Sequence, residues 1–380
     1  MDHKILIVSG EPSGDLHASN LVRDIKKLNP NVNFFGMGGS LSQRCGVDIV
    51  FDISRLALVG LLEVLKNIFI VKKAYEAILA KVESEKPDLA ILVDYPGFNL
   101  RLAKELYRRS IPVIYYISPQ VWAWGHDRVN IIKKYVKVII VFFKFEEELY
   151  RKYNINAAFV GHPLIDIVKV SRGREETFKK YSLSEEKATI ALLPGSRPLE
   201  VNNLLPLMIS ASKIVADRLK SVQFIVAKHP DLPIELYKST LKGSGIDIRI
   251  AEGDAYNILS ISDFAIVASG TATLESAIIG TPLIIVYKAS LLTFLLYKIV
   301  IRIPFLGIVN IISQKEVAPE FLQFNATPEN VAAKSIEIIN DKNRLKAMRE
   351  DLRVIRDSLG APGASGRAAR IVAANLQSSK

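Results

Sequence analysis

Short apolar runs alternate with helix-like segments along this chain, and the alternation starts again in its second half. Continuous Val, Ile and Leu between helices is typical of parallel strands that are covered on both faces. The predicted strands are residues 4–9, 32–39, 88–94, 112–118, 136–143 and 157–162, followed by 189–194, 222–229, 246–252, 263–270 and 282–288. The sequence therefore predicts two doubly wound α/β domains, joined near residues 165–187.

The chain length leads to the same number of domains. One hydrophobic core usually stops growing at roughly 250–300 residues, and this chain has 380. We expect Rossmann-like domains at residues 1–170 and 171–340, facing each other across a cleft, because ligands bind beyond the carboxyl ends of such strands. At Thr327, a Thr N-cap followed by Pro opens a run of helix formers. Residues 341–380 are predicted to form helices that pack across the two domains.

Charge and cysteine content limit the partners and the compartment. The net charge of +11 favours phosphates, nucleic acid or an acidic membrane surface. The sequence lacks the stripe of basic and aromatic residues of a nucleic-acid binder, so no nucleic-acid partner is expected. Cys45 is the only cysteine, which excludes an internal disulfide and a thiolate metal cluster. The N-terminus does not resemble a signal peptide, and we expect a cytoplasmic protein.

Several common catalytic motifs are absent. The loop VSGEPSGD at residues 8–15 follows a strand but fits neither G-x-G-x-x-G nor a P-loop. The serine-hydrolase motif G-x-S-x-G is also missing. The chain has no D-x-D pair and no clustered His/Asp spacing, so we expect neither a metal nor another cofactor.

Two strand-to-helix turns are candidate anion sites. Gly195, Ser196 and Arg197 lie in LLPGSRPLEV, where backbone N–H groups, the helix dipole and a fixed guanidinium would suit a diphosphate. An ordinary turn with a surface arginine is the alternative. In the second turn, SGTATLE, Gly270, Thr271 and Thr273 are followed by Glu275.

The second turn has two interpretations. Its N–H and hydroxyl groups could donate to phosphate oxygens, while the carboxylate of Glu275 could accept hydrogen bonds from ribose hydroxyls. Alternatively, Gly270 and Thr271 only cap the helix, and Glu275 is a favourable acid near its start. The sequence of this turn alone does not decide between them.

Two carboxylates are candidate general bases. Asp94 ends a buried-looking strand in LAILVDYPGFN, where a carboxylate can reach a ligand beyond the sheet. It could instead cap the helix that begins near Gly97. Asp15, in GDLHAS, presents the same choice between chemistry and satisfying backbone groups.

Residues 55–79 are apolar at helical spacing, with Lys66, Lys72 and Lys73 alongside. The usual explanation is a core helix, which the residues alone favour. An apolar face with basic flanks is also typical of a helix that inserts into an anionic bilayer.

Taken together, these residues resemble one family, the lipid-A-disaccharide synthases, which are bacterial glycosyltransferases of the two-Rossmann-domain (GT-B) type. The resemblance runs from about Ile5 to Gln323. Its motifs are SGEPSGDLHA, LVGLLEVL, DYPGFN, YYISPQVWAWGHDR, VGHPLID, LLPGSRPLEV, ASGTATLESAIIGTP and VNIISQKEVAPEFLQ. The combination of ISPQVWAW with GSR and the following EV is highly specific.

The resemblance implies an inverting enzyme that joins UDP-2,3-diacylglucosamine to 2,3-diacylglucosamine 1-phosphate, releasing UDP and a β-1,6-linked disaccharide without a bound metal. It places UDP in the second domain and the acceptor in the first. Asp94 is the first choice for the base, and Asp15 the second. The residues expected to bind UDP are Gly195, Ser196, Arg197, Ser269, Gly270, Thr271, Ala272, Thr273 and Glu275.

The family resemblance adds candidates on the acceptor side and at the membrane. Ser13 and Gly14 would line the acceptor side, and Asn310 and Gln323 belong to a shared motif whose bland interpretation is a closing loop. Members of the family work at the cytoplasmic face of the inner membrane, which favours bilayer contact over the core for part of residues 55–79. The residues expected to contact the anionic membrane surface are Leu58, Val59, Leu61, Leu62, Leu65, Ile68 and Phe69.

Two other functions compete with this interpretation. Another UDP-sugar enzyme of the same architecture, a 2-epimerase or the N-acetylglucosaminyl transferase of peptidoglycan synthesis, would share both anion turns but should lack ISPQVWAW. A peripheral membrane-binding protein without catalysis would also explain the charge and the apolar helix. It predicts vesicle binding without turnover of a UDP-sugar.

Overall fold

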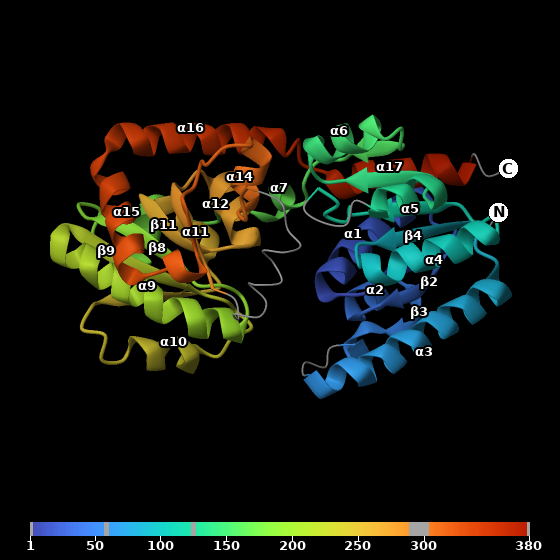
Figure 1. Ribbon diagram of the computed structural model, residues 1–380, viewed down its shortest axis with the longest axis horizontal. Helices are drawn as coiled ribbons and strands as arrows, with labels where there is room; N and C mark the ends of the chain where they lie inside the picture. Colours follow the sequence, from blue (N-terminus) through green and yellow to red (C-terminus); the bar gives the residue numbers. More distant parts are fainter. Residues whose placement is uncertain (1–2, 57–60, 123–126, 289–303, 378–380) are drawn as a thin grey trace. The chain divides into compact units, whose positions relative to one another are not determined.

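The chain forms two compact α/β units (Figure 1). The N-terminal unit contains residues 1–163 and 359–380, and the C-terminal unit contains residues 164–358. The division therefore falls several residues before the predicted boundary at 170. The computed structural model describes residues 3–56, 61–122, 127–288 and 304–377.

The N-terminal unit is built on a parallel sheet, which in the described residues has the order β3-β2-β1-β4-β5-β6-β7. Alternate side chains of each strand point to opposite faces, so Leu6 and Val8 join one core while Ile5 and Ile7 join the other. The strands are β1 (His3–Ser9), β2 (Val32–Gly38), β3 (Val47–Asp52), β4 (Leu89–Val93), β5 (Val113–Tyr116), β6 (Val138–Val141) and β7 (Ala157–Phe159).

Helices cover both faces of this sheet. One face packs against α3 (Leu61–Glu85), α4 (Pro96–Arg108) and α5 (Asp127–Tyr135). The other face packs against α1 (Pro12–Leu28) and α17 (Ala364–Gln377). Because α17 comes from the end of the chain and lies along α1, the C-terminus completes the N-terminal unit (Figure 1). The shorter helices of this unit are α2 (Ser40–Arg44), η1 (Ile53–Leu56) and α6 (Lys144–Lys152).

The C-terminal unit repeats the same plan. Its parallel sheet has the order β10-β9-β8-β11-β12-β13 in the described residues. The strands are β8 (Ala188–Leu193), β9 (Val222–Lys228), β10 (Ile248–Glu252), β11 (Phe264–Ala268), β12 (Leu283–Tyr287) and β13 (Glu320–Leu322). The fold class predicted from the sequence is thus confirmed, although β3 and β13 were not among the predicted strands.

The helices of the C-terminal unit also lie on both faces. One core is formed with α9 (Pro198–Arg218), α10 (Ile234–Leu241) and α15 (Pro328–Asn340), and α11 (Ala255–Ile261) and α12 (Thr271–Ile279) pack on the opposite face. The predicted cap of α15 is confirmed, since the Thr327 side chain accepts a hydrogen bond from the Asn330 N–H at 3.2 Å. The remaining helices are α7 (Leu164–Ile167), α8 (Arg174–Tyr181), α14 (Ile308–Ser313), η2 (Gln323–Asn325) and α16 (Lys342–Ser358).

Each sheet has one place where the strand order reverses direction. In the N-terminal unit β1 pairs with β2 on one side and with β4 on the other. In the C-terminal unit β8 lies in the same way between β9 and β11. The loops that follow β1 and β4, or β8 and β11, lead to helices on opposite faces of the sheet. Doubly wound sheets bind ligands at such a point, beyond the carboxyl ends of the strands.

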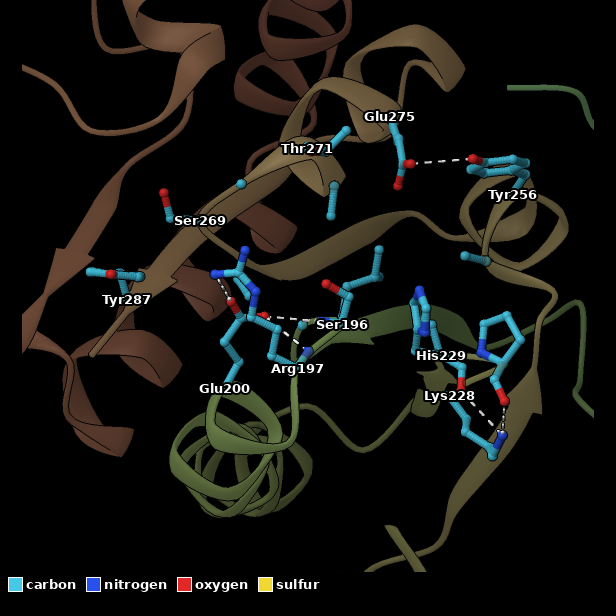
Figure 2. Close-up of a pocket in the computed structure, with 18 of the residues that line it drawn as sticks. Ser196, Arg197, Glu200, Lys228, His229, Tyr256, Ser269, Thr271, Glu275 and Tyr287 are labelled. Carbon is cyan, nitrogen blue, oxygen red and sulfur yellow. Dashed lines mark hydrogen bonds and ion pairs between the residues drawn. The ribbon is translucent and has the colours of Figure 1, made fainter. Parts of the chain in front are cut away.

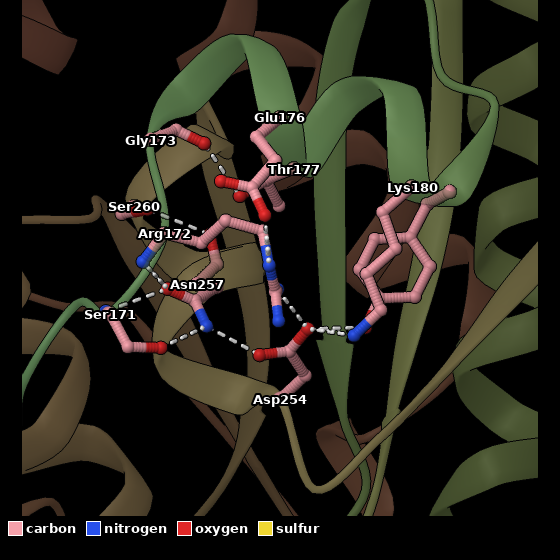
Figure 3. Close-up of polar contacts among 10 residues, drawn as sticks. Ser171, Arg172, Gly173, Glu176, Thr177, Lys180, Asp254, Asn257 and Ser260 are labelled. Atoms are coloured by element: carbon pink, nitrogen blue, oxygen red, sulfur yellow. Dashed lines mark hydrogen bonds and ion pairs between the residues drawn. The ribbon is translucent and has the colours of Figure 1, made fainter.

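The buried carboxylate of Asp254 joins the start of the C-terminal unit to α11 (Figure 3). Asp254, the N-cap residue of α11, accepts bonds from Arg172 at 2.7 Å and Lys180 at 2.8 Å. Burial alone would raise the pKa of Asp254, but these bonds, with those from Tyr181 and Asn257, hold it well below its usual range. Residues 171–181 are therefore fastened to α11, which explains why they belong to the C-terminal unit and not to a free linker.

Candidate functional site

A pocket of about 750 Å³ lies at the carboxyl edge of the C-terminal sheet (Figure 2). The segments that line it follow β8, β9, β10, β11 and β12, and it opens at the reversal of strand order between β8 and β11. Most of the residues predicted to bind UDP contribute to its wall. They are Gly195, Ser196, Arg197, Ser269, Gly270, Thr271, Ala272 and Glu275.

The turn before α9 differs from its prediction. The carboxylate of Glu200 accepts hydrogen bonds from the N–H groups of Ser196 at 3.0 Å and Arg197 at 3.3 Å. These N–H groups were expected to bind a phosphate, and here they donate to the carboxylate of Glu200 at the N3 position, whereas the Arg197 side chain makes no capping bond in return. The guanidinium of Arg197 remains 80% exposed, with a long ion pair of 3.8 Å to Glu200.

The turn before α12 keeps its donors at the pocket. Gly270 is the N-cap and has φ 148°, a conformation that favours glycine, and it brings no capping side chain to the helix. Ser269, Thr271 and Ala272 line the pocket around this helix start. Since helix N-termini favour anions, this turn is better suited to bind a phosphate than the turn before α9.

Thr273 is a correction to the predicted UDP-binding set. Its side chain is fully buried, and its hydroxyl donates to the Gly270 carbonyl at 2.8 Å. It does not contribute to the pocket wall within the described residues. The position three residues after the N-cap turns the hydroxyl back onto its own helix, so Thr273 shapes the turn instead of contacting a ligand.

Glu275 lies in the pocket wall opposite α11. The Tyr256 hydroxyl donates to its carboxylate at 3.2 Å (Figure 2). Burial raises the pKa of Glu275 above its ordinary value, and the bond from Tyr256 partly opposes that shift. A half-buried carboxylate fixed in this way can accept hydrogen bonds from a pair of hydroxyl groups.

Sequence reasoning missed part of the pocket. Lys228 and His229 at the end of β9, Tyr256 in α11 and Tyr287 at the end of β12 all line it. The Lys228 ammonium is buried and bonds to Glu252 at 2.7 Å, which holds the ends of β9 and β10 together. The signal was available, because Lys228, His229 and Tyr287 lie at the ends of predicted strands and Tyr256 follows another, at the same edge as the two anion turns.

Asp94 lies at the corresponding edge of the N-terminal unit, directly after β4. Asp94 and Tyr95 both have left-handed backbone conformations, with φ of 47° and 45°. Such conformations cost about 1–3 kcal/mol per residue and persist where the surroundings enforce them, often at functional sites. Burial and the nearby Glu11 carboxylate raise the pKa of Asp94 to about 6, against a bond from the Tyr95 N–H.

The first loop, SGEPSGD, packs against the Asp94 segment. A side chain at Gly10 would collide with the ring of Tyr95, so this glycine makes room for the Tyr95 ring. Gly14 is buried beside Ser9 and Val93, whereas Ser13 is exposed on the first turn of α1. The loop therefore supports the end of β4, and of its two predicted acceptor residues only Ser13 presents a side chain to solvent.

Asp15 is a structural carboxylate and not the reserve base that the sequence predicted. Its side chain is 3% exposed and accepts bonds from the N–H groups of Gly39 at 2.9 Å, Leu41 at 3.1 Å and Ser42 at 3.2 Å. The Ser42 hydroxyl donates to it as well. Four donors at the start of α2 use its lone pairs, so Asp15 anchors α2 to α1.

The two candidates from VNIISQKEVAPEFLQ have different settings. Asn310 is fully buried, and its amide bonds to Ala318 at 2.7 Å, Glu320 at 2.8 Å and the Val317 N–H at 2.8 Å. It therefore fixes the loop that precedes β13 within the C-terminal unit. Gln323 begins η2 in a left-handed conformation, with φ 52°.

Most of the side chains predicted to contact a membrane lie outside the described part of the chain. Leu58 and Val59 lie outside the described residues, as do the side chains of Leu61, Leu62, Leu65 and Ile68. Phe69 on α3 is described, and its side chain is 69% exposed. None of the described helices is both long and apolar enough to span a bilayer.

Trp122, in the motif ISPQVWAW, is held in place by the buried carboxyl group of Glu146. The Trp122 indole N–H donates to Glu146 at 3.3 Å, and its ring packs edge-on against Phe145. Burial raises the pKa of Glu146 to about 7. Trp122 is half-buried, whereas Trp124 lies outside the described residues.

Solved structures with the same architecture bind UDP-sugars. A UDP-GlcNAc 2-epimerase from Neisseria meningitidis, solved with UDP-GlcNAc, matches with a TM-score of 0.61 and 11% identity over 99% of this chain and 100% of that chain. A Medicago truncatula glycosyltransferase with UDP-glucose matches with a TM-score of 0.60 and 12% identity, over 99% and 98%. In fold, the chain is a two-domain Rossmann protein of the GT-B class.

Sequence comparison narrows the class to one family. The family model described as lipid-A-disaccharide synthetase matches residues 5–372. A lipid-A-disaccharide synthase from Syntrophus aciditrophicus is 43% identical over 96% of both chains, and one from Geobacter metallireducens is 39% identical over 97% of this chain and 96% of its own. The chain belongs to the lipid-A-disaccharide synthetase family and is a glycosyltransferase of the hexosyltransferase class.

Proposed function

We propose that this enzyme transfers 2,3-diacylglucosamine from UDP to the 6-hydroxyl of 2,3-diacylglucosamine 1-phosphate, with inversion at the anomeric carbon. The observation that carries the proposal is the Asp94 carboxylate, half-buried at the reversal of strand order in the N-terminal unit, with its pKa raised to about 6. At neutral pH this carboxylate is ionised yet more basic than an ordinary aspartate. Both properties suit a general base.

The proposed reaction needs one base and one site for the leaving group. Asp94 takes the proton of the acceptor 6-hydroxyl as its oxygen attacks the anomeric carbon, and the bond from that carbon to the diphosphate oxygen breaks. The developing charge on UDP is stabilised by the N-terminus of α12 at Gly270–Ala272 and by the exposed guanidinium of Arg197. Glu275 accepts hydrogen bonds from the ribose hydroxyls.

The role of Arg197 follows from its surroundings. The N–H groups beside it are bonded to Glu200, so the side chain is the part of this turn that can reach a diphosphate. An always charged, planar guanidinium can pair with two phosphate oxygens at once.

With these lipid substrates, we propose that the enzyme works at the cytoplasmic surface of the inner membrane. The net charge of +11 favours an anionic bilayer, and the exposed Phe69 on α3 is in the segment predicted to contact it. Bilayer contact through α3 would bring the N-terminal unit to the acyl chains of its acceptor.

Replacing the base tests this proposal. Asp94→Asn should lower turnover by about 10²- to 10⁴-fold, because an amide cannot accept the proton, while the affinity for UDP, measured by calorimetry, is retained. Asp48→Asn is the matched control, since Asp48 lies at the start of β3, is 65% exposed and pairs with Lys81. Turnover of Asp94→Asn close to that of the unchanged enzyme would remove Asp94 from this role.

A further inference from the structure

The backbone at the end of β4 is bent by consecutive left-handed residues that are not glycine. Asp94 has φ 47°, and Tyr95 has φ 45° and ψ 57°. A strand that continued in extended form would carry the Asp94 side chain in another direction, because side chains alternate along a strand. Whatever enforces the bend therefore also sets where the carboxylate points.

Two buried side chains donate to the carbonyl of Asp94. The Asn99 amide nitrogen lies 2.8 Å from this oxygen, and the Tyr115 hydroxyl lies 2.6 Å from it. The Asn99 nitrogen also donates to the Val93 carbonyl at 3.1 Å. Because both neighbours of the amide are carbonyl oxygens, only its nitrogen can face them.

The next residue is held by packing. The Tyr95 ring lies against Gly10, where a larger residue would collide with it, and stacks on Phe98 with 5.9 Å between the ring centres. The Tyr95 carbonyl accepts from the N–H of Asn99 at 3.0 Å, which begins α4. The bend is thus enforced from the strand side, from the helix side and from the first loop.

Burying the side-chain amide of Asn99 costs free energy unless its N–H group makes hydrogen bonds that stabilise the fold. Asn99 is fully buried, and its carbonyl oxygen has no hydrogen-bond partner among the residues that the structure describes. An apolar side chain of similar size would avoid that unpaired atom. The amide nitrogen, with its bonds to Val93 and Asp94, is therefore the part of Asn99 that accounts for its presence.

We propose that Asn99 and Tyr115 are positioning residues, which hold the Asp94 carbonyl and so aim the Asp94 carboxylate at the acceptor hydroxyl. The proposal rests on the function proposed above, in which Asp94 is the base. Neither Asn99 nor Tyr115 contacts the substrate. Each acts through the backbone of Asp94.

The test is a double-mutant cycle on turnover. Tyr115→Phe removes one hydroxyl from a buried ring, and Asn99→Leu removes the amide while keeping a similar volume. Each change should lower kcat by about 10- to 100-fold, as expected for a misplaced catalytic group, without altering the affinity for UDP. In the Asp94→Asn background the same changes should lower the rate by no more than about twofold, since no base is left to aim.

Tyr107→Phe on α4 is the matched control, because its ring is 54% exposed and lies away from β4's end, and it should leave kcat unchanged. If Asn99→Leu does not fold, Tyr115→Phe alone completes the cycle. Equal slowing in both backgrounds, or normal kcat in the single variants, would overturn the positioning role while Asp94 stays the base. Normal turnover of Asp94→Asn itself would overturn the base and the positioning role together, and that variant alone reveals it.

Discussion

At the scale of single residues, four carboxylates lie near the carboxyl ends of the strands of the two sheets, and their hydrogen-bond partners differ. Asp94 is half-buried with a raised pKa, and Asp15 is saturated by four donors. Glu200 caps its own helix, and Glu275 bonds to one tyrosine. The sequence predicts Asp94, Asp15 and Glu275 at these edges, but not which of them keeps its oxygens available, because the donors to Asp15 and Glu275 are distant in sequence.

Glu11 should tune the base. Burial is the larger cause of the raised pKa of Asp94, and the charge of Glu11 is the second. Glu11→Gln removes that charge, so the pKa of Asp94 should fall. Since Asp94 acts in its ionised form, the acidic limb of the profile of kcat/KM against pH should move to lower pH, with little change at neutral pH.

The measurement is the pH profile of UDP release for both proteins in the same buffers. Glu176→Gln is a suitable control, because Glu176 is 72% exposed and pairs with Arg172 in the other unit. An acidic limb that stays in place, or that moves to higher pH, would show that Glu11 does not act on the catalytic base.

At the scale of elements, the two helix N-termini of the pocket were both predicted as candidate anion sites, and their backbone N–H groups differ in what they contact. In the turn before α9, Glu200 at the N3 position bonds back to the N-cap N–H as in a capping box, but Arg197 at the N-cap has no acceptor for the second bond. Without Ser or Thr at the N-cap, the sequence carries no capping-box signature. The turn before α12 has Gly270 at its N-cap. The physical difference is one glutamate, Glu200, folded back onto its own helix.

Removing the backbone N–H group of Thr271 tests whether the N-terminus of α12 binds the diphosphate. Thr271 is the first residue of α12, where proline is well tolerated. Thr271→Pro should weaken UDP binding by about tenfold or more relative to Thr271→Ala, because a hydrogen bond to a charged group contributes about 1.5–3 kcal/mol and only proline removes the N–H. Calorimetry with UDP measures both variants.

Arg174→Pro controls for the proline itself, since Arg174 is exposed and begins α8 after another glycine N-cap. It should leave UDP affinity unchanged. Equal affinities of Thr271→Pro and Thr271→Ala would mean that the α12 turn does not hold the diphosphate.

Most elements were predictable because their signals are local. The buried strands β1, β4, β8 and β11 are continuous apolar runs, and Thr327 and Pro328 mark the start of α15. In contrast, β3 is more mixed in burial and β13 has three residues, so neither gives a strong pattern. The family resemblance predicts Asn310 as a site residue, and it carries no information on the internal hydrogen bonds of that side chain.

At the scale of the whole molecule, the C-terminal segment, whose helices were predicted to pack across the two domains, is divided between the two units. Residues 341–380 are not one body: α16 belongs to the C-terminal unit, and α17 completes the N-terminal unit against α1. The composition of 341–380 predicts helices, but it cannot show that they divide between two cores. That choice depends on which sheet face is left uncovered.

Acceptor-dependent release of UDP is the most direct test of the central claim. UDP-2,3-diacylglucosamine in detergent micelles should yield UDP only when 2,3-diacylglucosamine 1-phosphate is added, and a chelator should not change the rate. UDP formed equally without the acceptor, or a donor that is bound but never consumed, would contradict the transferase account and favour an epimerase or a membrane-binding protein.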